Sequence, residues 1–311
     1  MFDSLAEAVT QAEAAGCSLG ELALQAETGD GRRTRPEVEA ALLHALSVMR
    51  GAVARGLVGD VYSVSGLVGG DAAKLAAAGL RARTDASAAT PPSHGLLAGT
   101  VFGDALARAI AVQEVNAAMG VIVAAPTAGG AGVLPGVLLA VGERVGADDA
   151  LLVRGLAAAG LVGAVIAQRA SLSGAEAGCQ AETGAAASMA AAAAVEVLGG
   201  SARQQATASA LALQGTLGLV CDPLGGLVEI PCVFRNATGA AIALAGVEMA
   251  LAGITFAIPA DEVIDTMGEI GRTMDARYRE TAGGGLAATP TGRRLARERL
   301  SIGVGKGGGN G

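Results

Sequence analysis

Small side chains dominate the apolar stretches of this chain, and they restrict how a core can be built from it. From Val137 to Leu198, alanines and glycines recur with the three- and four-residue spacing of helices. Alanine is the residue that most favours a helix, and helices that meet through alanine and glycine can approach closely. The sequence therefore predicts a body of tightly packed helices.

Helical spacing also runs through residues 2–50, with a break at GDGRRTRPE, and again through residues 101–118. VIVAAP at Val121 and LVEIPCVF at Leu227 could form short strands, but neither has the neighbours that a sheet requires. We predict an all-α fold with an N-terminal helical segment over residues 1–50, a main domain over 51–302, a loop over 84–95 and a flexible Gly-rich tail over 303–311.

The high apolar content, 51% of residues against 16% charged, raises the possibility of a membrane protein. The uncharged stretch from Val115 to Gly142 is interrupted by Pro126 and Pro135. Residues 239–260 carry only one charge and are the best candidate by hydropathy, but the chain has no Trp for an interfacial belt. We expect no membrane span.

Charge and the N-terminus indicate where the protein works and what it does not bind. The net charge is −7, so we do not expect a basic surface that would bind nucleic acid. Aromatic residues make up only 2%, so few side chains are present on which bases could stack. The N-terminus MFDSLAEAVTQAEAAG lacks the basic start and apolar core of a secretory signal. We expect a cytoplasmic protein.

The cysteines are too few for a disulfide framework. Cys179 lies in SGAEAGCQAE, Cys221 in VCDPLGG and Cys232 in EIPCVFRN, while Cys17 stands apart. Isolated cysteines often pack as small hydrophobes, and the spacing alone leaves that possibility open beside metal binding. Three thiolates suit a 4Fe-4S cluster with one open iron, which can act as a Lewis acid.

Zinc is the less suitable metal for these cysteines. It would want four ligands, and His44 and His94 are distant in sequence. His44 is expected on a helix face in a structural role, and His94 in PPSHG is either a solvated loop residue or a base in a cleft. For Arg279 and Glu280 in YRETAGGG we favour a solvated pair at a helix end.

Two glycine-rich segments, SGLVGGDA at Ser65–Ala72 and PTAGGAG at Pro126–Gly132, could present backbone N–H groups to an anion. Neither matches a P-loop or a dinucleotide-binding fingerprint, so nucleotide binding is disfavoured. Glycine-rich turns between helices are also common in any Ala/Gly-rich chain. Ser65, Asp71 and Thr127 add polar side chains that favour a binding role.

Taken together, these segments resemble the alpha subunit of bacterial iron-sulfur L-serine dehydratase along almost the whole chain. The motifs, in that family's order, are MRGAVARGLVGDVYSVSGLVGGDAAKL, VNAAMGVIVAAPTAGGAGVLPG, SGAEAGCQAE, CDPLGGLVEIPCVFRN and YRETAGGGLAATPTG. Val68 and Thr183 depart from the expected pattern, but neither is a proposed ligand. They leave open whether threonine or cysteine is accepted beside serine.

The resemblance implies a helical L-serine ammonia-lyase (EC 4.3.1.17) of amino-acid degradation and gluconeogenesis, with residues 51–302 as its catalytic domain. It implies a 4Fe-4S cluster and no pyridoxal phosphate, and a separate beta subunit that contributes to the active site, including its proton-transfer group. Cys17 is left as structural, and no residue is identified as the base. The implied metal ligands are Cys179, Cys221 and Cys232. The residues we assign to catalysis are Ser65, Asp71, Thr127, Ser173 and Asn236, and those assigned to substrate binding are Gly66, Gly69, Gly70, Ala128, Gly129 and Gly130.

Two other functions remain open at this point. A related iron-sulfur lyase that degrades cysteine would release a thiol in place of hydroxide. A non-enzymatic iron-sulfur or zinc sensor would hold every metal position closed, and added serine would leave its spectrum unchanged. An incompletely liganded iron predicts oxygen sensitivity for the enzyme.

Overall fold

The computed structural model describes residues 2–29, 31–84 and 100–304. Within these ranges the chain forms helices and no strand, and two isolated bridges, Tyr62 with Gly69 and Cys221 with Arg279, are its only β-type pairings. The all-α prediction is therefore confirmed. His94, nearly all of the predicted loop over 84–95 and most of the predicted tail lie outside the described residues.

The helices are α1 (Leu5–Ala15), α2 (Leu19–Thr28), α3 (Arg35–Leu57), α4 (Asp71–Thr84), α5 (Val101–Ala117), α6 (Val133–Val145), α7 (Asp149–Arg169), α8 (Gly174–Ala177), α9 (Ala185–Val197), α10 (Ala202–Gln214), α11 (Cys232–Leu251), α12 (Ala260–Thr273) and α13 (Pro290–Val304). Shorter turns are the π-helical turn η2 (Gln180–Gly184) and the 3₁₀ turns η3 (Leu224–Gly226), η4 (Ala276–Tyr278) and η5 (Gly285–Ala288).

Short polar side chains begin many of these helices. The Ser4 hydroxyl accepts the N–H of Glu7 at the start of α1, which ends at Gly16 with a φ of +63°. Helix α2 ends at Thr28 and α3 begins at Arg35, so the predicted break falls within GDGRRTRPE, whose last three residues already belong to α3. Helix α3 then continues without a break through residue 50, the predicted end of the N-terminal segment.

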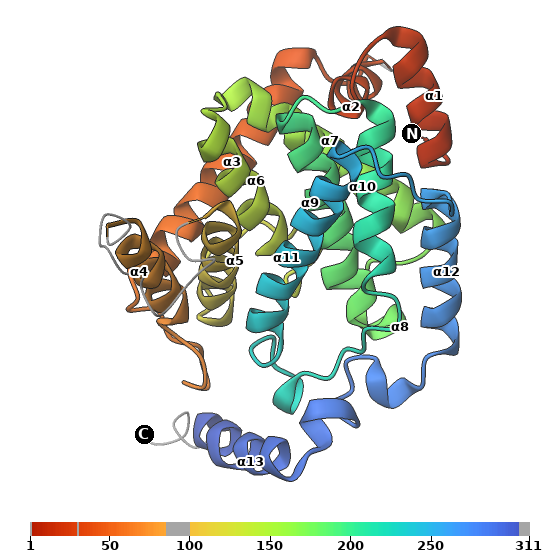
Figure 1. Cartoon of the computed structure of the whole chain (residues 1–311). Coiled ribbons are helices and arrows are strands. Elements are labelled where there is room, and N and C mark those ends of the chain that lie inside the picture. Colours follow the sequence, from red (N-terminus) through yellow and green to blue (C-terminus); the bar gives the residue numbers. More distant parts are fainter. Residues whose placement is uncertain (1, 30, 85–99, 305–311) are drawn as a thin grey trace.

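Helix α9 forms the centre of the body, and every one of its residues is buried. It packs against α6, α7, α10 and α11, which surround it in Figure 1. Glycines let neighbouring helices come close: a Cβ on Gly155 of α7 would lie 3.3 Å from the carbonyl oxygen of Ala193, and one on Gly246 of α11 would lie 2.7 Å from that of Ala208. The close packing through small residues, predicted from the sequence, is thus seen at individual contacts.

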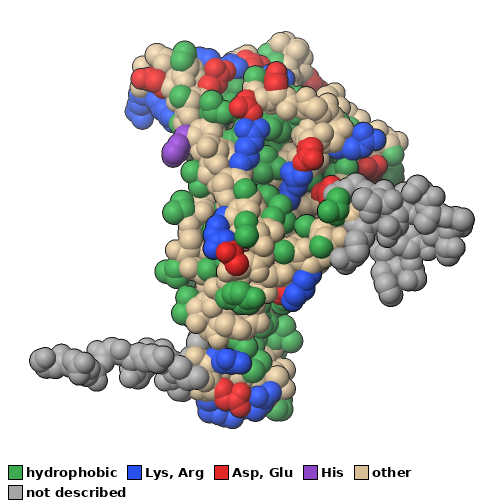
Figure 2. Space-filling view, turned by 90° about the vertical axis from the view of Figure 1, so that its left-hand side faces the viewer, with side chains coloured by type: hydrophobic (Ala, Val, Ile, Leu, Met, Phe, Trp, Pro, Cys, Tyr) green, Lys and Arg blue, Asp and Glu red, His purple; other side chains and the backbone are tan. Residues whose placement is uncertain are grey.

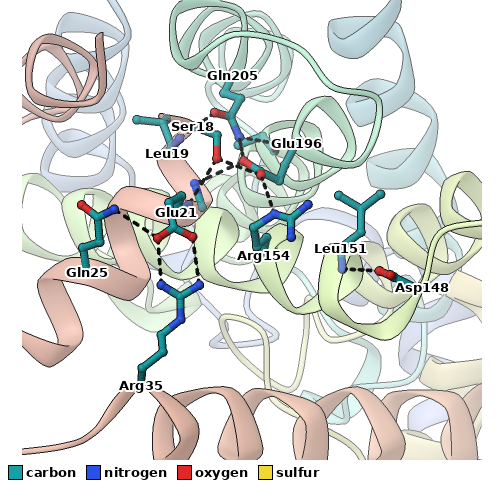
Figure 3. Close-up of polar contacts among 12 residues, drawn as sticks. Ser18, Leu19, Glu21, Gln25, Arg35, Asp148, Leu151, Arg154, Glu196 and Gln205 are labelled. Carbon is teal, nitrogen blue, oxygen red and sulfur yellow. Dashed lines mark hydrogen bonds and ion pairs between the residues drawn. The ribbon is translucent and has the colours of Figure 1, made fainter. Parts of the chain in front are cut away.

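A buried carboxylate joins the N-terminal helices to this centre (Figure 3). Glu196 of α9 is 5% exposed and accepts hydrogen bonds from the Ser18 hydroxyl at 2.8 Å and the Gln205 amide at 2.8 Å. The N–H of Gly20 donates to it at 3.2 Å, and the Arg154 guanidinium lies 3.5 Å away. Because α2 begins here, the carboxylate meets the positive end of a helix as well as several donors.

Cys17 lies beside this network, in a different part of the body from the other three cysteines. Its thiol is partly buried, and burial, with Glu21 and Glu196 nearby, raises the pKa of Cys17. The thiol therefore stays protonated at neutral pH and is not poised for metal binding.

One helix of the described residues is long and apolar enough to cross a membrane, and it is α7. The prediction that residues 239–260 are the best candidate is wrong, because α11 ends at Leu251. Of the most apolar 18-residue window of α7, 67% is buried inside the body. Such burial is typical of a core helix, because a spanning helix turns apolar side chains to lipid.

Figure 2 shows the face that bears α3 and α4. Among the described residues on this face, basic and acidic side chains are interspersed, and hydrophobic side chains are exposed between them. At the other end of the chain, α12 leads through η4 and η5 to α13, which lies below the helical body in Figure 1. This connection runs along the functional site described next.

Candidate metal and substrate site

The three cysteines of the second half come from three segments and lie close enough for their side chains to interact electrostatically. Cys179 immediately precedes η2, Cys221 lies in the coil after α10, and Cys232 is the first residue of α11. All three are buried and their thiols are free. Gly178 allows the approach, since its φ is +74° and a Cβ there would lie 2.8 Å from the carbonyl oxygen of Leu219.

A fourth side chain, Glu182, faces two of these thiols. The Sγ atoms of Cys179 and Cys221 and a carboxylate oxygen of Glu182 all lie within 4.8 Å of one another. Glu182 is 8% exposed, and the Thr127 hydroxyl donates to its Oε1 at 2.7 Å. Burial raises the pKa of Glu182. The π-helical turn that carries it is a form of helix often found at functional sites.

The thiols differ in how readily they ionise. The hydrogen bond with Cys221 lowers the pKa of Cys179 to about 7, and Thr183 and Arg235 act in the same direction against the effect of burial. The Thr183 hydroxyl lies 3.2 Å from the Cys179 sulfur. The hydrogen bond with Cys179 and burial raise the pKa of Cys221, and burial raises the pKa of Cys232 to about 12. Cys179 is therefore the first of these thiols to become a thiolate.

Arg235 supplies the positive charge beside the thiols. Its guanidinium lies 2.7 Å from Oδ1 of Asp222 and donates to the carbonyl oxygen of Val220 at 2.8 Å. Asp222 is 2% exposed, and its Oδ2 accepts the N–H of Leu286 at 2.6 Å. This ion pair therefore joins the coil after α10 to α11 and to the connection that leads to α13.

The glycine segment Pro126–Gly132 packs directly on Glu182. A Cβ on Gly129 would lie 2.8 Å from its Oε1, and a Cβ on Gly130 would lie 2.8 Å from its backbone oxygen. Asn236, fully buried, donates to the carbonyl oxygens of Gly129 at 2.7 Å and Cys232 at 2.8 Å. The same side chain accepts the N–H of Gly132 at 2.9 Å, so it ties this segment to the start of α11.

The other glycine segment is held by two buried glutamates. The N–H of Ser65 donates to Glu229 at 3.1 Å, and the Ser65 hydroxyl donates to the other oxygen of the same carboxylate. The N–H of Asp71, the first residue of α4, donates to Glu114 at 2.7 Å. Both N–H groups therefore already have carboxylate partners, in contrast to the free anion-binding groups suggested by the sequence.

Glycines shape the turn of this segment. Gly66 and Gly70 have φ values of +70° and +73°, and a Cβ on Gly69 would lie 2.5 Å from the carbonyl oxygen of Val61. Val68 is buried in a small cluster with Val233, the second residue of α11. The segment therefore lies against the same helix that begins with Cys232.

Helix α5 links the two glycine segments. Gln113 is fully buried and its amide donates to the carbonyl oxygen of Ala128 at 2.8 Å, while the next residue, Glu114, holds Asp71. The side chain of Asp71 is partly buried, and its carboxylate pairs with Lys74 at 2.7 Å. Neighbouring positions of one helix thus place both segments at the same end of the body.

Ser173 and its neighbour Gly174 border the thiols. Ser173 is half-buried at the start of α8, and a Cβ on Gly174 would lie 3.3 Å from the Cys221 sulfur and 2.5 Å from Glu182 Oε2. His44, by contrast, is exposed on α3, a helix that supplies no residue to this site.

The interpretation of Arg279 and Glu280 as a solvated pair at a helix end was wrong. Both are half-buried, and the chain here pairs with Cys221. The N–H of Cys221 donates to the carbonyl oxygen of Tyr278 at 2.8 Å, and the N–H of Glu280 donates to that of Cys221 at 2.9 Å. The segment is thus a wall of the site.

The donor set fits a thiophilic metal centre. Three buried thiols, one of them readily ionised, lie beside a guanidinium and among donors that can bond to sulfur. The buried or partly buried side chains that support this set were not predicted from the sequence. They are Gln113, Glu114, Glu182, Glu229 and Arg235. Two signals were present, since Glu114 interrupts an apolar helix and Glu182 stands inside the motif of Cys179.

The chain is similar to proteins of one known family. The sequence model of the family described as "Serine dehydratase alpha chain" matches residues 5–287. The "Probable L-serine dehydratase, alpha chain" of Bacillus subtilis is 48% identical over 96% of this chain and 95% of its own length. The "L-serine dehydratase, alpha chain" of Peptoniphilus asaccharolyticus is 37% identical over 97% of this chain and 100% of its own length. The "L-serine dehydratase" of Streptomyces coelicolor is 41% identical over 90% of this chain but only 59% of its own length.

Proposed function

Because the chain belongs to the serine dehydratase alpha chain family, we propose that it converts L-serine to pyruvate and ammonia as a carbon-oxygen lyase. The observation that carries the proposal is 48% identity to an alpha chain of probable L-serine dehydratase along nearly the full length of both chains. The resemblance noted in the sequence is thereby confirmed at the level of the family.

The proposed cofactor is a 4Fe-4S cluster bound by Cys179, Cys221 and Cys232, and no pyridoxal phosphate takes part. Three free, buried thiols that meet from distant segments support this choice. With one iron not bound by the protein, such a cluster would supply a Lewis acid for the substrate hydroxyl. Arg235 favours ionised thiols beside it.

The two glycine segments are the proposed substrate site. Among the described residues, the backbone N–H groups of Gly129 and Gly130 have no acceptor, so they can bind the serine carboxylate. The carboxylate of Asp71, which is 29% exposed, can bind the serine ammonium in exchange for Lys74. Asn236 and the Thr127–Glu182 hydrogen bond keep the first segment in place, and Ser65 anchors the second on Glu229.

The reaction removes one water and later takes one up. Loss of the Cα proton and of the hydroxyl group gives 2-aminoacrylate, whose imine tautomer is hydrolysed to pyruvate and ammonia. We assign no residue of this chain as the base, and propose that a separate beta chain supplies the proton-transfer group.

Two observations support a partner. Relatives named as alpha chains are matched over 95–100% of their length in Bacillus and Peptoniphilus, whereas the Streptomyces protein, named simply "L-serine dehydratase", is longer than the matched part. Large apolar side chains are also exposed on two turns beside the site, Tyr62 and Val64 on one and Met119 and Val121 on the other. The N–H of Val64 donates to Ala117, which holds these turns together. We propose that the beta chain docks here, in the cytoplasm, where thiols stay reduced.

The test is anaerobic purification of the chain with its beta chain, followed by iron and sulfide analysis, absorption spectra before and after L-serine, and a pyruvate assay. We expect about four irons per chain, a spectral change with serine, and pyruvate formation, all lost in Cys221→Ser and all kept in Cys17→Ser. Cysteine and threonine are assayed as alternative substrates in place of serine. Pyruvate formation by a protein without iron would contradict the proposed cofactor, and an iron-loaded protein that leaves serine unchanged would contradict the activity.

A further inference from the structure

Two thiols and one carboxylate at this site have the spacing of ligands for a single ion. Metal–sulfur bonds of about 2.3 Å and metal–oxygen bonds of about 2.1 Å place tetrahedral ligand atoms about 3.6 Å apart. The sulfur of Cys221 and Oε2 of Glu182 are 3.8 Å apart, and Cys179 completes a set within 4.8 Å. A cubane of four irons and four sulfides holds its terminal ligands farther apart than one ion does.

The surroundings orient these three groups. The Thr127 hydroxyl donates to Oε1 of Glu182, which leaves Oε2 facing the sulfur atoms. The Thr183 hydroxyl lies 3.2 Å from the sulfur of Cys179. Hydrogen bonds of this kind hold the ligand atoms of a metal site in their orientation. Gly174 completes the enclosure, since any Cβ there would lie 2.5 Å from Glu182 Oε2.

We propose that the chain without its cluster binds one thiophilic divalent cation, such as Zn²⁺, through Cys179, Cys221 and Glu182. Three protein ligands leave a fourth position for water. Cys232 lies outside the set of three, so it is not a ligand of this ion. Because Cys179 and Cys221 would be ligands of both the ion and the cluster, a bound ion prevents the cluster from forming. Only this last step rests on the proposed function.

Cobalt tests the site, because a thiolate–Co²⁺ centre absorbs in the near ultraviolet and a tetrahedral one has strong visible bands. The metal-free full-length chain is titrated anaerobically with Co²⁺, and Zn²⁺ is then added to displace it. We expect one Co²⁺ per chain, with at least about tenfold weaker binding in Cys179→Ser, Cys221→Ser and Glu182→Gln. Cys232→Ser and Cys17→Ser should titrate like the wild type.

Glu182→Gln keeps the shape of the side chain and an acceptor for Thr127, and circular dichroism verifies the fold of each variant. Equal binding by Glu182→Gln would show that the carboxylate is not a ligand, and weaker binding by Cys232→Ser would indicate a site of three cysteines. Either result, or no binding by the wild type, overturns the proposal.

Reconstitution of the same variants with iron and sulfide separates this inference from the proposed function. Cys232→Ser should fail to form a cluster while it still binds Co²⁺, and prior addition of Zn²⁺ should block cluster formation in the wild type. A wild-type chain that binds Co²⁺ but never forms a cluster would contradict the proposed cofactor and leave the ion site standing.

Discussion

Buried glutamates hold both glycine segments in this protein. Glu229 accepts from Ser65, Glu114 from Asp71 and Glu182 from Thr127. A buried carboxylate is costly unless it accepts hydrogen bonds, and each of these finds its donor in a glycine segment. The segments are therefore fixed by polar contacts to the helical body, although their glycines would otherwise allow many conformations.

Glu114 makes stability depend on pH. Burial raises its pKa above that of the unfolded chain, so the folded protein binds a proton that the unfolded one has released. Stability from this group is complete below the unfolded value, about 4.5, and declines as pH rises through the folded pKa. We expect Glu114→Gln to remove this decline.

Urea unfolding from pH 4.5 to 8 measures this effect. The control is Glu248→Gln, a change at an exposed glutamate, whose stability should fall with pH as that of the wild type does. A Glu114→Gln variant whose stability falls with pH as steeply as that of the wild type would contradict the assignment.

The ion pair of partly buried Arg235 with buried Asp222 should stabilise the fold far more than an exposed ion pair does. Arg235→Met leaves the Asp222 carboxylate, 2% exposed, without its counter-ion, and we expect a loss of about 3–5 kcal/mol of unfolding free energy. Arg203→Met breaks an exposed pair with Glu13 and should cost about 0–1 kcal/mol.

Chemical denaturation of the metal-free chain compares these two variants. If the pair is coupled, the double variant Arg235→Met, Asp222→Asn should lose less stability than the sum of its single changes. Strict additivity would indicate that the two side chains act independently.

At the scale of elements, most of the fold could be predicted from the sequence. Residue spacing predicted helix over residues 2–50 with a break at GDGRRTRPE, which separates α2 from α3, but it did not predict the break between α1 and α2. The alanine content predicted the close packing around α9. The same spacing could not show which glycines face another helix. Nor could it show that Glu114 and Glu196 are buried, because that depends on neighbours far along the chain.

Two glycines of α3 illustrate this limit. Gly56 packs on α5, where a Cβ would lie 2.3 Å from the carbonyl oxygen of Ala111, whereas a Cβ on Gly51 would meet nothing within 4 Å. Gly56→Ala should therefore destabilise the chain by about 1–3 kcal/mol. Gly51→Ala should stabilise it by up to about 1 kcal/mol, because alanine favours the helix.

Thermal unfolding followed by circular dichroism compares the two alanine variants. Opposite shifts in melting temperature are expected, and equal shifts would mean that the contact between α3 and α5 is not close.

On the scale of the whole molecule, the site joins segments that are distant in sequence. Residues 65–71 and 126–132 meet α11 and the cysteines at one end of the helical body, and residues 276–289 pass along it. The motifs in the sequence predicted these segments separately. Their meeting depends on α5 and on Asn236, whose partners only the folded chain reveals.

The two turns beside the site expose large apolar side chains that we expect the beta chain to cover. Val64 is 71% exposed and Met119 is 82% exposed, and Met119 also has a φ of +61°, which is uncommon for a residue other than glycine. If the beta chain covers these side chains, their burial contributes about 1.5–3 kcal/mol each to binding. Val64→Asp and Met119→Asp should each weaken association with the beta chain at least about tenfold, since 1.4 kcal/mol corresponds to a factor of ten.

Anaerobic calorimetric titration of the alpha chain with the beta chain measures this affinity, and Ile254→Asp, another exposed apolar position at 50% exposure, is the matched control. The two test variants should recover serine turnover at high beta chain concentration, because their own metal and substrate residues are intact. If Val64→Asp and Met119→Asp bind the beta chain as tightly as Ile254→Asp does, the partner docks on a different face, and the exposed turns need another explanation.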